Sequence, residues 1–281
     1  MKLIGKFKVT SLILLAAILL QINACSEDET ALTPGDSPTV PPQTSMVVDF
    51  TEFPDTNSPG PLFRLEPSDT ILRGNWGWAA GHVWVWSTII KVGMAIPVAA
   101  FVESFNHQPV QQPNGSWLWT YTLTISGINY TAKLYGTSVT NGIEWRMLLT
   151  KAGFYTDFEW FTGFSNTPAT EGTWTLNKDP NDPVPFLLIE WSRNVEDNTA
   201  QVKYTNIVPN VPENGSYIHY GKTNEITYDR FFNIFGIAEN RLINVEWNYK
   251  EHFGRVKDPQ HFGSENWNCW DEMLFDTQCP E

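Results

Sequence analysis

The sequence predicts a mainly β protein: a long antiparallel meander that forms a barrel or a curved half-barrel, with one apolar helix, about residues 79–105, packed on its concave face. Three observations predict this fold. Apolar and polar residues alternate with a period of two through most of the chain after residue 117. Turn-forming pairs such as Ser126-Gly127 and Asn141-Gly142 divide this alternation into short segments. One long apolar run, residues 83–105, does not follow it.

The first 24 residues predict an export signal, in which Lys2, Lys6 and Lys8 precede a short apolar stretch. The stretch ends in Ile22-Asn23-Ala24-Cys25, which resembles the lipobox of bacterial lipoproteins. That resemblance implies cleavage before Cys25 and acyl chains on Cys25 that anchor the protein in the outer membrane. The acidic residues that follow Ser26 are similar to the surface-export signal of Bacteroidota-type lipoproteins, so we expect the cell surface. An ordinary secretory leader that ends near a cysteine is the alternative.

Residues 25–45 predict a disordered tether, because this stretch has four acidic residues, four prolines and no aromatic or basic residue. The sequence becomes apolar at Met46, so we expect one β-rich domain over residues 46–281. The whole chain has 18 basic and 31 acidic residues, a net charge of −13. This balance excludes a nucleic-acid binder that neutralises phosphates, and it predicts that the lipid rather than the protein surface contacts a membrane.

The strands follow from the alternation. Residues 117–125 place Trp, Tyr, Leu and Ile on one face and mostly Thr on the other. About ten segments of this kind are predicted: 117–125, 128–138, 142–150, 155–164, 171–178, 185–193, 199–207, 215–221, 226–236 and 241–250.

Four Glu-Trp pairs lie in these segments with the same phase, so the Trp and the Glu occupy opposite faces. Their carboxylates are Glu144, Glu159, Glu190 and Glu246. The plain interpretation is that Trp fills the core and Glu pairs with Lys or Arg on neighbouring strands. The alternative is that two of these carboxylates converge as the acid/base pair of a glycoside hydrolase.

Residues 83–105 contain only two charged residues, Lys91 and Glu103, among 23. We expect a mostly buried helix, bent or restarted at Pro97, that packs on the aromatic face of the sheet. A pair of buried strands is the alternative. A membrane span is disfavoured by Lys91, Gly93 and Pro97, and by the lipid anchor already expected at Cys25.

Two features mark the C-terminal region. Cys269 and Cys279 should form a disulfide in an exported protein, since no third ligand suggests a metal site. His252 and His261 flank a polar loop that includes Asp258. This loop is either a solvated connection or a binding or acid/base site.

The sequence contains none of the common nucleotide-binding, hydrolase or metalloprotease motifs, so we expect no cofactor and no metal. The missing motifs favour a non-enzymatic role and leave enzymatic activity open. The leading hypothesis is a hydrophobic ligand held between helix and sheet. Its expected cavity lining is Trp84, Trp119, Trp145, Trp160, Trp191 and Trp247. The alternatives are a carbohydrate-binding or glycoside-hydrolysing surface lipoprotein, and an adhesion module without a small-molecule site.

Overall fold

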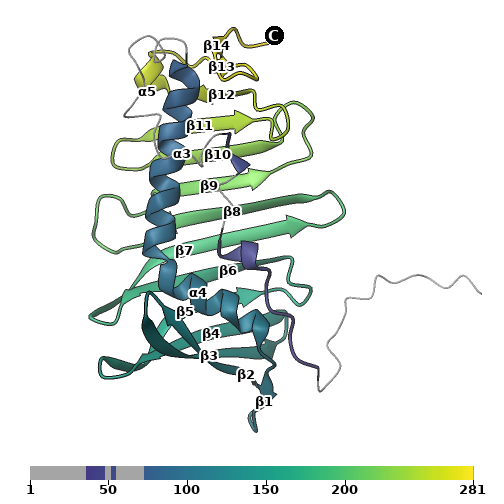
Figure 1. Ribbon diagram of the computed structural model, residues 1–281, viewed down its shortest axis with the longest axis vertical. Helices are drawn as coiled ribbons and strands as arrows, with labels where there is room; N and C mark the ends of the chain where they lie inside the picture. The colour runs from purple at the N-terminus through teal and green to yellow at the C-terminus, as the bar shows by residue number, and fades with distance from the viewer. Residues whose placement is uncertain (1–35, 48–51, 55–72, 281) are drawn as a thin grey trace, which may run out of the picture. The chain divides into compact units, whose positions relative to one another are not determined.

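The computed structural model describes residues 36–47, 52–54 and 73–280. Fourteen strands form one antiparallel sheet in which every strand pairs with the next along the chain (Figure 1). The strands are β1 (Val110–Gln111), β2 (Trp117–Ile125), β3 (Ile128–Val139), β4 (Gly142–Lys151), β5 (Tyr155–Ser165), β6 (Glu171–Asp179), β7 (Asp182–Asn194), β8 (Thr199–Asn206), β9 (Tyr217–Lys222), β10 (Arg230–Gly236), β11 (Arg241–Trp247), β12 (Gly254–Lys257), β13 (Asn268–Trp270) and β14 (Asp276–Thr277).

The predicted mainly β meander is confirmed, and its form is an open curved sheet rather than a closed barrel. The ten predicted segments correspond to β2 through β11. The edge strands β1 and β14, and the short strands β12 and β13, were not predicted. These have four residues or fewer, which is too short for an alternation to be recognised.

The inner face of the sheet, which carries most of the tryptophans, is built from Trp–Gly pairs on neighbouring strands. Trp145 lies opposite Gly136 on one side and Gly163 on the other, and Gly163 also lies opposite Trp174. The same pairing joins Gly172 to Trp191, and Gly254 to both Trp247 and Trp270. A Cβ on Gly163 would lie 2.2 Å from the Trp174 ring, so the ring covers the space that a side chain would occupy. The large number of tryptophans is therefore matched to glycines across the strands.

Two helices cross this face in place of the single predicted one: α3 (Gly74–Gly93) and α4 (Ala95–Glu103). They meet at Met94 with an angle of 68° between them. The break therefore lies before Pro97, which sits in the first turn of α4, where a backbone N–H has no partner within the helix. Short helices η3 (Ser104–Asn106) and α5 (Pro259–Phe262) complete the helical elements after α4. The strand alternative for residues 83–105 is wrong.

The helix α3 is held at its N-terminus by the far end of the sheet. The Asp276 carboxylate in β14 accepts hydrogen bonds from the Gly74 and Asn75 backbone N–H groups at 3.1 and 2.9 Å. It therefore caps a helix that has no cap from its own Arg73. At the other end, the Tyr121 hydroxyl in β2 donates to the Ala100 carbonyl of α4. The two helices thus span the strands from one end of the sheet towards the other (Figure 1).

The α3 helix is less buried than predicted. Val83 and Ile90 face the core, whereas the side chains of Val85, Ile89 and Val92 are exposed, Val92 by 74%. Within the described residues, no single helix is long and apolar enough to cross a membrane, and α3 with the helical segment after it passes only as a bent pair.

Residues 36–47, here called the strap, lie on the inner face and contain the short helix η1 (Gln43–Ser45). Ser45 and Met46 are buried, the Ser45 hydroxyl accepts from Trp174 Nε1 at 3.2 Å, and the Met46 carbonyl accepts from the Tyr204 hydroxyl at 3.1 Å. Residues 36–45 therefore belong to the folded domain and not to the tether. The composition of this segment predicted disorder, because the segment alone has too little apolar surface to bury. In the folded chain, the sheet supplies the apolar surface on which the strap packs.

The C-terminal end is fixed by the Cys269–Cys279 disulfide, with Cα atoms 5.2 Å apart, as expected from the sequence. Cys269 is buried in β13, next to Trp270.

Candidate functional site

The outer face of the sheet carries the four glutamates of the Glu-Trp pairs, and three of them are in cross-strand ion pairs. Glu159 pairs with Arg146, Glu190 with Lys203 at 3.6 Å, and Glu246 with Arg255. Glu144 lies opposite Thr137 and Phe164 and has no ion pair among the described residues. This is the arrangement expected if the glutamates serve as paired surface charges.

The register keeps these carboxylates apart. Glu159 lies opposite Leu148, four residues along β4 from Glu144, which corresponds to roughly 13 Å at about 3.3 Å per residue. Glu190 and Glu246 lie on β7 and β11, four strand spacings of about 4.8 Å apart. Two carboxyl groups that cleave a glycosidic bond are separated by about 5–9.5 Å. The geometry therefore does not assemble an acid/base pair from these residues.

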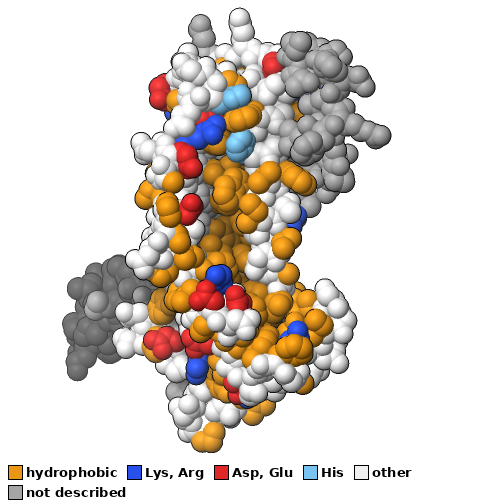
Figure 2. All heavy atoms as spheres, turned by 90° about the vertical axis from the view of Figure 1, so that its left-hand side faces the viewer, with side chains coloured by type: hydrophobic (Ala, Val, Ile, Leu, Met, Phe, Trp, Pro, Cys, Tyr) orange, Lys and Arg blue, Asp and Glu red, His pale blue; other side chains and the backbone are white. Residues whose placement is uncertain are grey.

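On the inner face, five of the six tryptophans expected to line a cavity are buried. Trp119, Trp145, Trp160 and Trp247 pack in the core, and Trp191 is 5% exposed at the wall of a pocket. Trp84 is the exception: it lies in α3 with 39% of its surface exposed, and it does not line that pocket. Figure 2 shows a hollow lined by hydrophobic side chains that runs lengthwise along the molecule.

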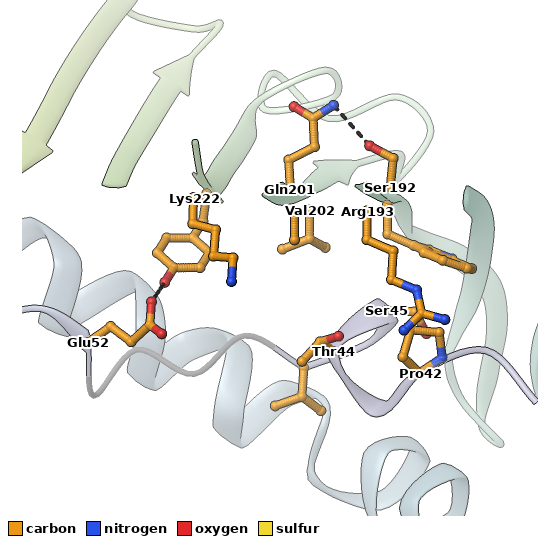
Figure 3. A pocket seen from close by; sticks show the side chains of 13 residues that line it. Pro42, Thr44, Ser45, Glu52, Ser192, Arg193, Gln201, Val202 and Lys222 are labelled. Atoms are coloured by element: carbon orange, nitrogen blue, oxygen red, sulfur yellow. Dashed lines mark hydrogen bonds between the residues drawn. The ribbon is translucent and has the colours of Figure 1, made fainter. Parts of the chain in front are cut away.

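A pocket of about 230 Å³ lies between the strap and the ends of β7, β8 and β9, and we call it the strap pocket (Figure 3). Its apolar walls come from both the strap and the sheet. Polar side chains lie around these walls. The complete lining is Pro42, Thr44, Ser45, Val47, Glu52, Trp191, Ser192, Arg193, Ala200, Gln201, Val202, Tyr220 and Lys222. The pocket combines a mostly apolar interior with a few polar groups, which is the usual composition of a small-molecule site.

Two cations flank a small residue in this pocket. Arg193 of β7 lies opposite Ala200 of β8, and Ala200 lies opposite Lys222 of β9. The small side chain of Ala200 leaves space between the cations, whose backbones are about 10 Å apart across two strand spacings. In Figure 3, the Arg193 guanidinium lies beside Pro42 and Ser45, and Lys222 extends on the other side of the space.

The polar groups of the pocket are incompletely satisfied. Arg193 Nε and Trp191 Nε1 are buried and have no hydrogen-bond partner among the described residues. Lys222 Nζ donates to a neutral acceptor, Asn198 Oδ1. Unsatisfied buried donors are uncommon in folded proteins and cost free energy. Trp76 Nε1, Trp160 Nε1 and Thr205 Oγ1 also lack a partner among the described residues, so what distinguishes this pocket is that two such donors line it together.

Among the described residues that line the pocket, Glu52 is the one carboxylate, and it already has partners. Glu52 Oε2 accepts from the Tyr220 hydroxyl and from Arg230 Nε, both at 2.6 Å. Arg230 is also paired with Asp229 at 3.1 Å. Its interactions with Glu52 and Asp229, which outweigh the effect of burial, raise the pKa of Arg230. Glu52 is therefore neutralised locally, and the remaining charge of the pocket is positive.

A second polar cluster occupies the opposite edge of the inner face, where Asp258 is fully buried. It accepts from Arg241 Nε and from Trp78 Nε1, both at 3.1 Å. Burial alone would raise the pKa of Asp258, but these hydrogen bonds together outweigh it and hold the pKa below its usual value. The Asp258 loop is therefore a buried anchor, which neither sequence interpretation anticipated.

Two histidines surround this anchor. The His261 ring stacks on Trp78 with centroids 3.6 Å apart, and His82 Nδ1 lies 2.9 Å from the Trp78 carbonyl oxygen. Burial lowers the pKa of His82, which keeps it neutral near pH 7. These contacts fix α3 to α5 and β11.

Sequence reasoning identified Trp191 but missed Arg193, Lys222 and the strap. A signal was present: Arg193 follows Trp191 by two residues, so it is a cation on an apolar face. The described residues contain no cluster of three or more potential metal ligands. Cys25 and the export signal lie outside the described residues. Comparison with known proteins found no family model that matches the chain, and no match among curated proteins or solved structures.

Proposed function

We propose that the protein is a surface-anchored lipoprotein that binds, without catalysing a reaction, a small molecule with a hydrophobic body in the strap pocket. The anchoring part rests on the lipobox-like Ile22-Asn23-Ala24-Cys25 and on the acidic residues that follow it. The binding part rests on the pocket: an apolar interior of about 230 Å³ on a sheet that leaves Trp191 Nε1 and Arg193 Nε without partners. This single observation carries the proposal.

A binding role is favoured over catalysis because the described carboxylates do not form an acid/base pair. Three of the four Glu-Trp carboxylates are held in ion pairs on the outer face, and the buried Asp258 is held by Arg241. The pocket volume lies below the range of about 300–1,000 Å³ that is common for drug-sized ligands. We therefore expect a ligand smaller than a long-chain lipid.

The test compares the wild-type chain with a variant whose pocket is filled. Ala200→Leu places a larger apolar side chain between Arg193 and Lys222 without removing a polar group. Native mass spectrometry of the full-length chain should detect a bound small molecule in the wild type and none in the variant. After the ligand has been removed, the two proteins should have equal thermal unfolding temperatures. Equal retention by both proteins would contradict a ligand site under the strap.

A further inference from the structure

We infer that the ligand of the strap pocket is a monocarboxylic acid with a short apolar body, and that Arg193 and Lys222 hold its carboxylate. The inference rests on the proposed function and names the ligand class of the same pocket.

The arginines of the inner face differ in their partners. Arg230 is paired with Glu52 and Asp229, and Arg241 with Asp258. Arg193 stands on the same face, and no carboxylate pairs with it among the described residues. A guanidinium presents two parallel donors that match a carboxylate, and the other two arginines show that this chain satisfies such groups with carboxylates. The missing partner of Arg193 is thus of the same chemical type.

The position of the neighbouring donors also favours a carboxylate. Lys222 faces Arg193 across Ala200. Trp191 lies two residues before Arg193 in β7, on the same face of the sheet. Trp191 is 5% exposed, lines the pocket and has a free Nε1–H. The two cations that flank Ala200, and the Trp191 Nε1–H on the wall of the same pocket, supply only donors, so they fit a group that supplies only acceptors.

The pocket also limits the charge and size of the ligand. Glu52 stands on the pocket wall, and although Arg230 neutralises it, it disfavours a second negative charge on the ligand. The walls formed by Val47, Val202 and Tyr220 are suited to a hydrocarbon or aromatic body rather than to a sugar or a phosphate. About 230 Å³ accommodates a short body only.

The experiment titrates the full-length chain with matched series of hexanoate, octanoate, decanoate and 3-phenylpropionate, and with the amide and amine of each. Ligand-observed NMR gives the affinities. We expect the acids to bind at least about tenfold more tightly than their amides, and the amines not to bind, as for one charge-assisted hydrogen bond. Inorganic phosphate should not displace the acid.

Three variants locate the effect. Arg193→Met should lower acid affinity about tenfold while leaving amide affinity unchanged, and Arg193→Lys should restore part of the loss. Lys203→Met removes the same charge from the outer face, where Lys203 pairs with Glu190, and should leave acid binding unchanged. Because Arg193 has no side-chain partner in the described chain, Arg193→Met should not alter thermal unfolding.

The outcomes separate the two proposals. If acids and amides bind equally and Ala200→Leu abolishes both, the pocket binds a small molecule but the carboxylate inference fails. If none of the probes binds the wild-type chain, the proposed function fails together with the inference. Displacement of the acid by phosphate, or an equal loss of acid binding in Lys203→Met, would assign the affinity to general charge and overturn the inference.

Discussion

The inner face of the sheet has two edges that each place an arginine among aromatic side chains, and the two edges differ in how that arginine is satisfied. At one edge, Arg241 is closed off by the buried Asp258, which Trp78 also binds. At the other edge, Arg193 lies in the strap pocket and its Nε has no partner. The fold can therefore pair a buried charged group fully where that group has a structural role, as at the Arg241 edge, which we call the complete edge. The Arg193 edge, where the guanidinium lacks a partner, is the incomplete edge and the better candidate for binding.

The largest effect should come from removing the ion pair between Asp258 and Arg241 at the complete edge. Asp258→Asn removes the charge that balances Arg241, and we expect a loss of about 3 kcal/mol in the free energy of unfolding, as for one half of a buried pair. Urea unfolding measures it. Arg193→Met at the incomplete edge should change this free energy little. The comparison breaks down if both substitutions destabilise the protein equally.

Glycines under tryptophan rings provide the next test, because one packs against Trp191 of the strap pocket and the other against Trp270, which does not line that pocket. A Cβ on Gly254 would lie 2.2 Å from the Trp270 ring, and a Cβ on Gly172 would lie 2.2 Å from the Phe164 carbonyl oxygen and 2.9 Å from the Trp191 ring. We expect Gly254→Ala and Gly172→Ala each to cost about 1–3 kcal/mol of stability. Only Gly172→Ala should also weaken ligand binding, since it displaces Trp191.

A helical glycine serves as the control for this pair. A Cβ on Gly77 in α3 would meet nothing within 4 Å. Gly77→Ala should therefore stabilise the chain by about 0.5–1 kcal/mol through helix propensity. Thermal unfolding of the three variants should give two losses and one gain, and a loss at Gly77 would contradict the packing described here.

The smallest effect should be a pH dependence at the complete edge. Burial lowers the pKa of His82 in the folded chain, so below the ordinary value of about 6.5 the unfolded chain binds more protons and stability falls as the pH falls. Asp258, whose folded pKa is also lowered, adds its own loss only below about pH 4. His82→Gln should reduce the loss of stability between pH 7 and 5 and leave the loss below pH 4. An unchanged slope between pH 7 and 5 would exclude His82 as its source.

Much of the fold could be predicted because β2 through β11 each bury one face, and burial of one face produces a period of two in the sequence. Whether the sheet closes depends on strand tilt and register, which the period does not encode. The helix break was expected at Pro97 and lies at Met94, because Pro97 is compatible with the first turn of a helix.

The candidate site was predictable only in part. Trp191 could be found because its phase places it inside, and the same phase places Arg193 inside. That Lys222 approaches Arg193 across Ala200 depends on the register of three strands, which no local pattern specifies. The strap could not be found because its burial depends on a surface that exists only after the sheet has formed.

The capping of α3 by Asp276 has a consequence for the order in which the chain acquires its structure. Each strand of the meander pairs with its neighbour in sequence, so the hairpins can form early with little loss of loop entropy. The bonds from Gly74 and Asn75 to Asp276 connect residues about 200 positions apart. They must wait for the last strand, and during synthesis α3 cannot be capped until the C-terminal residues have left the ribosome.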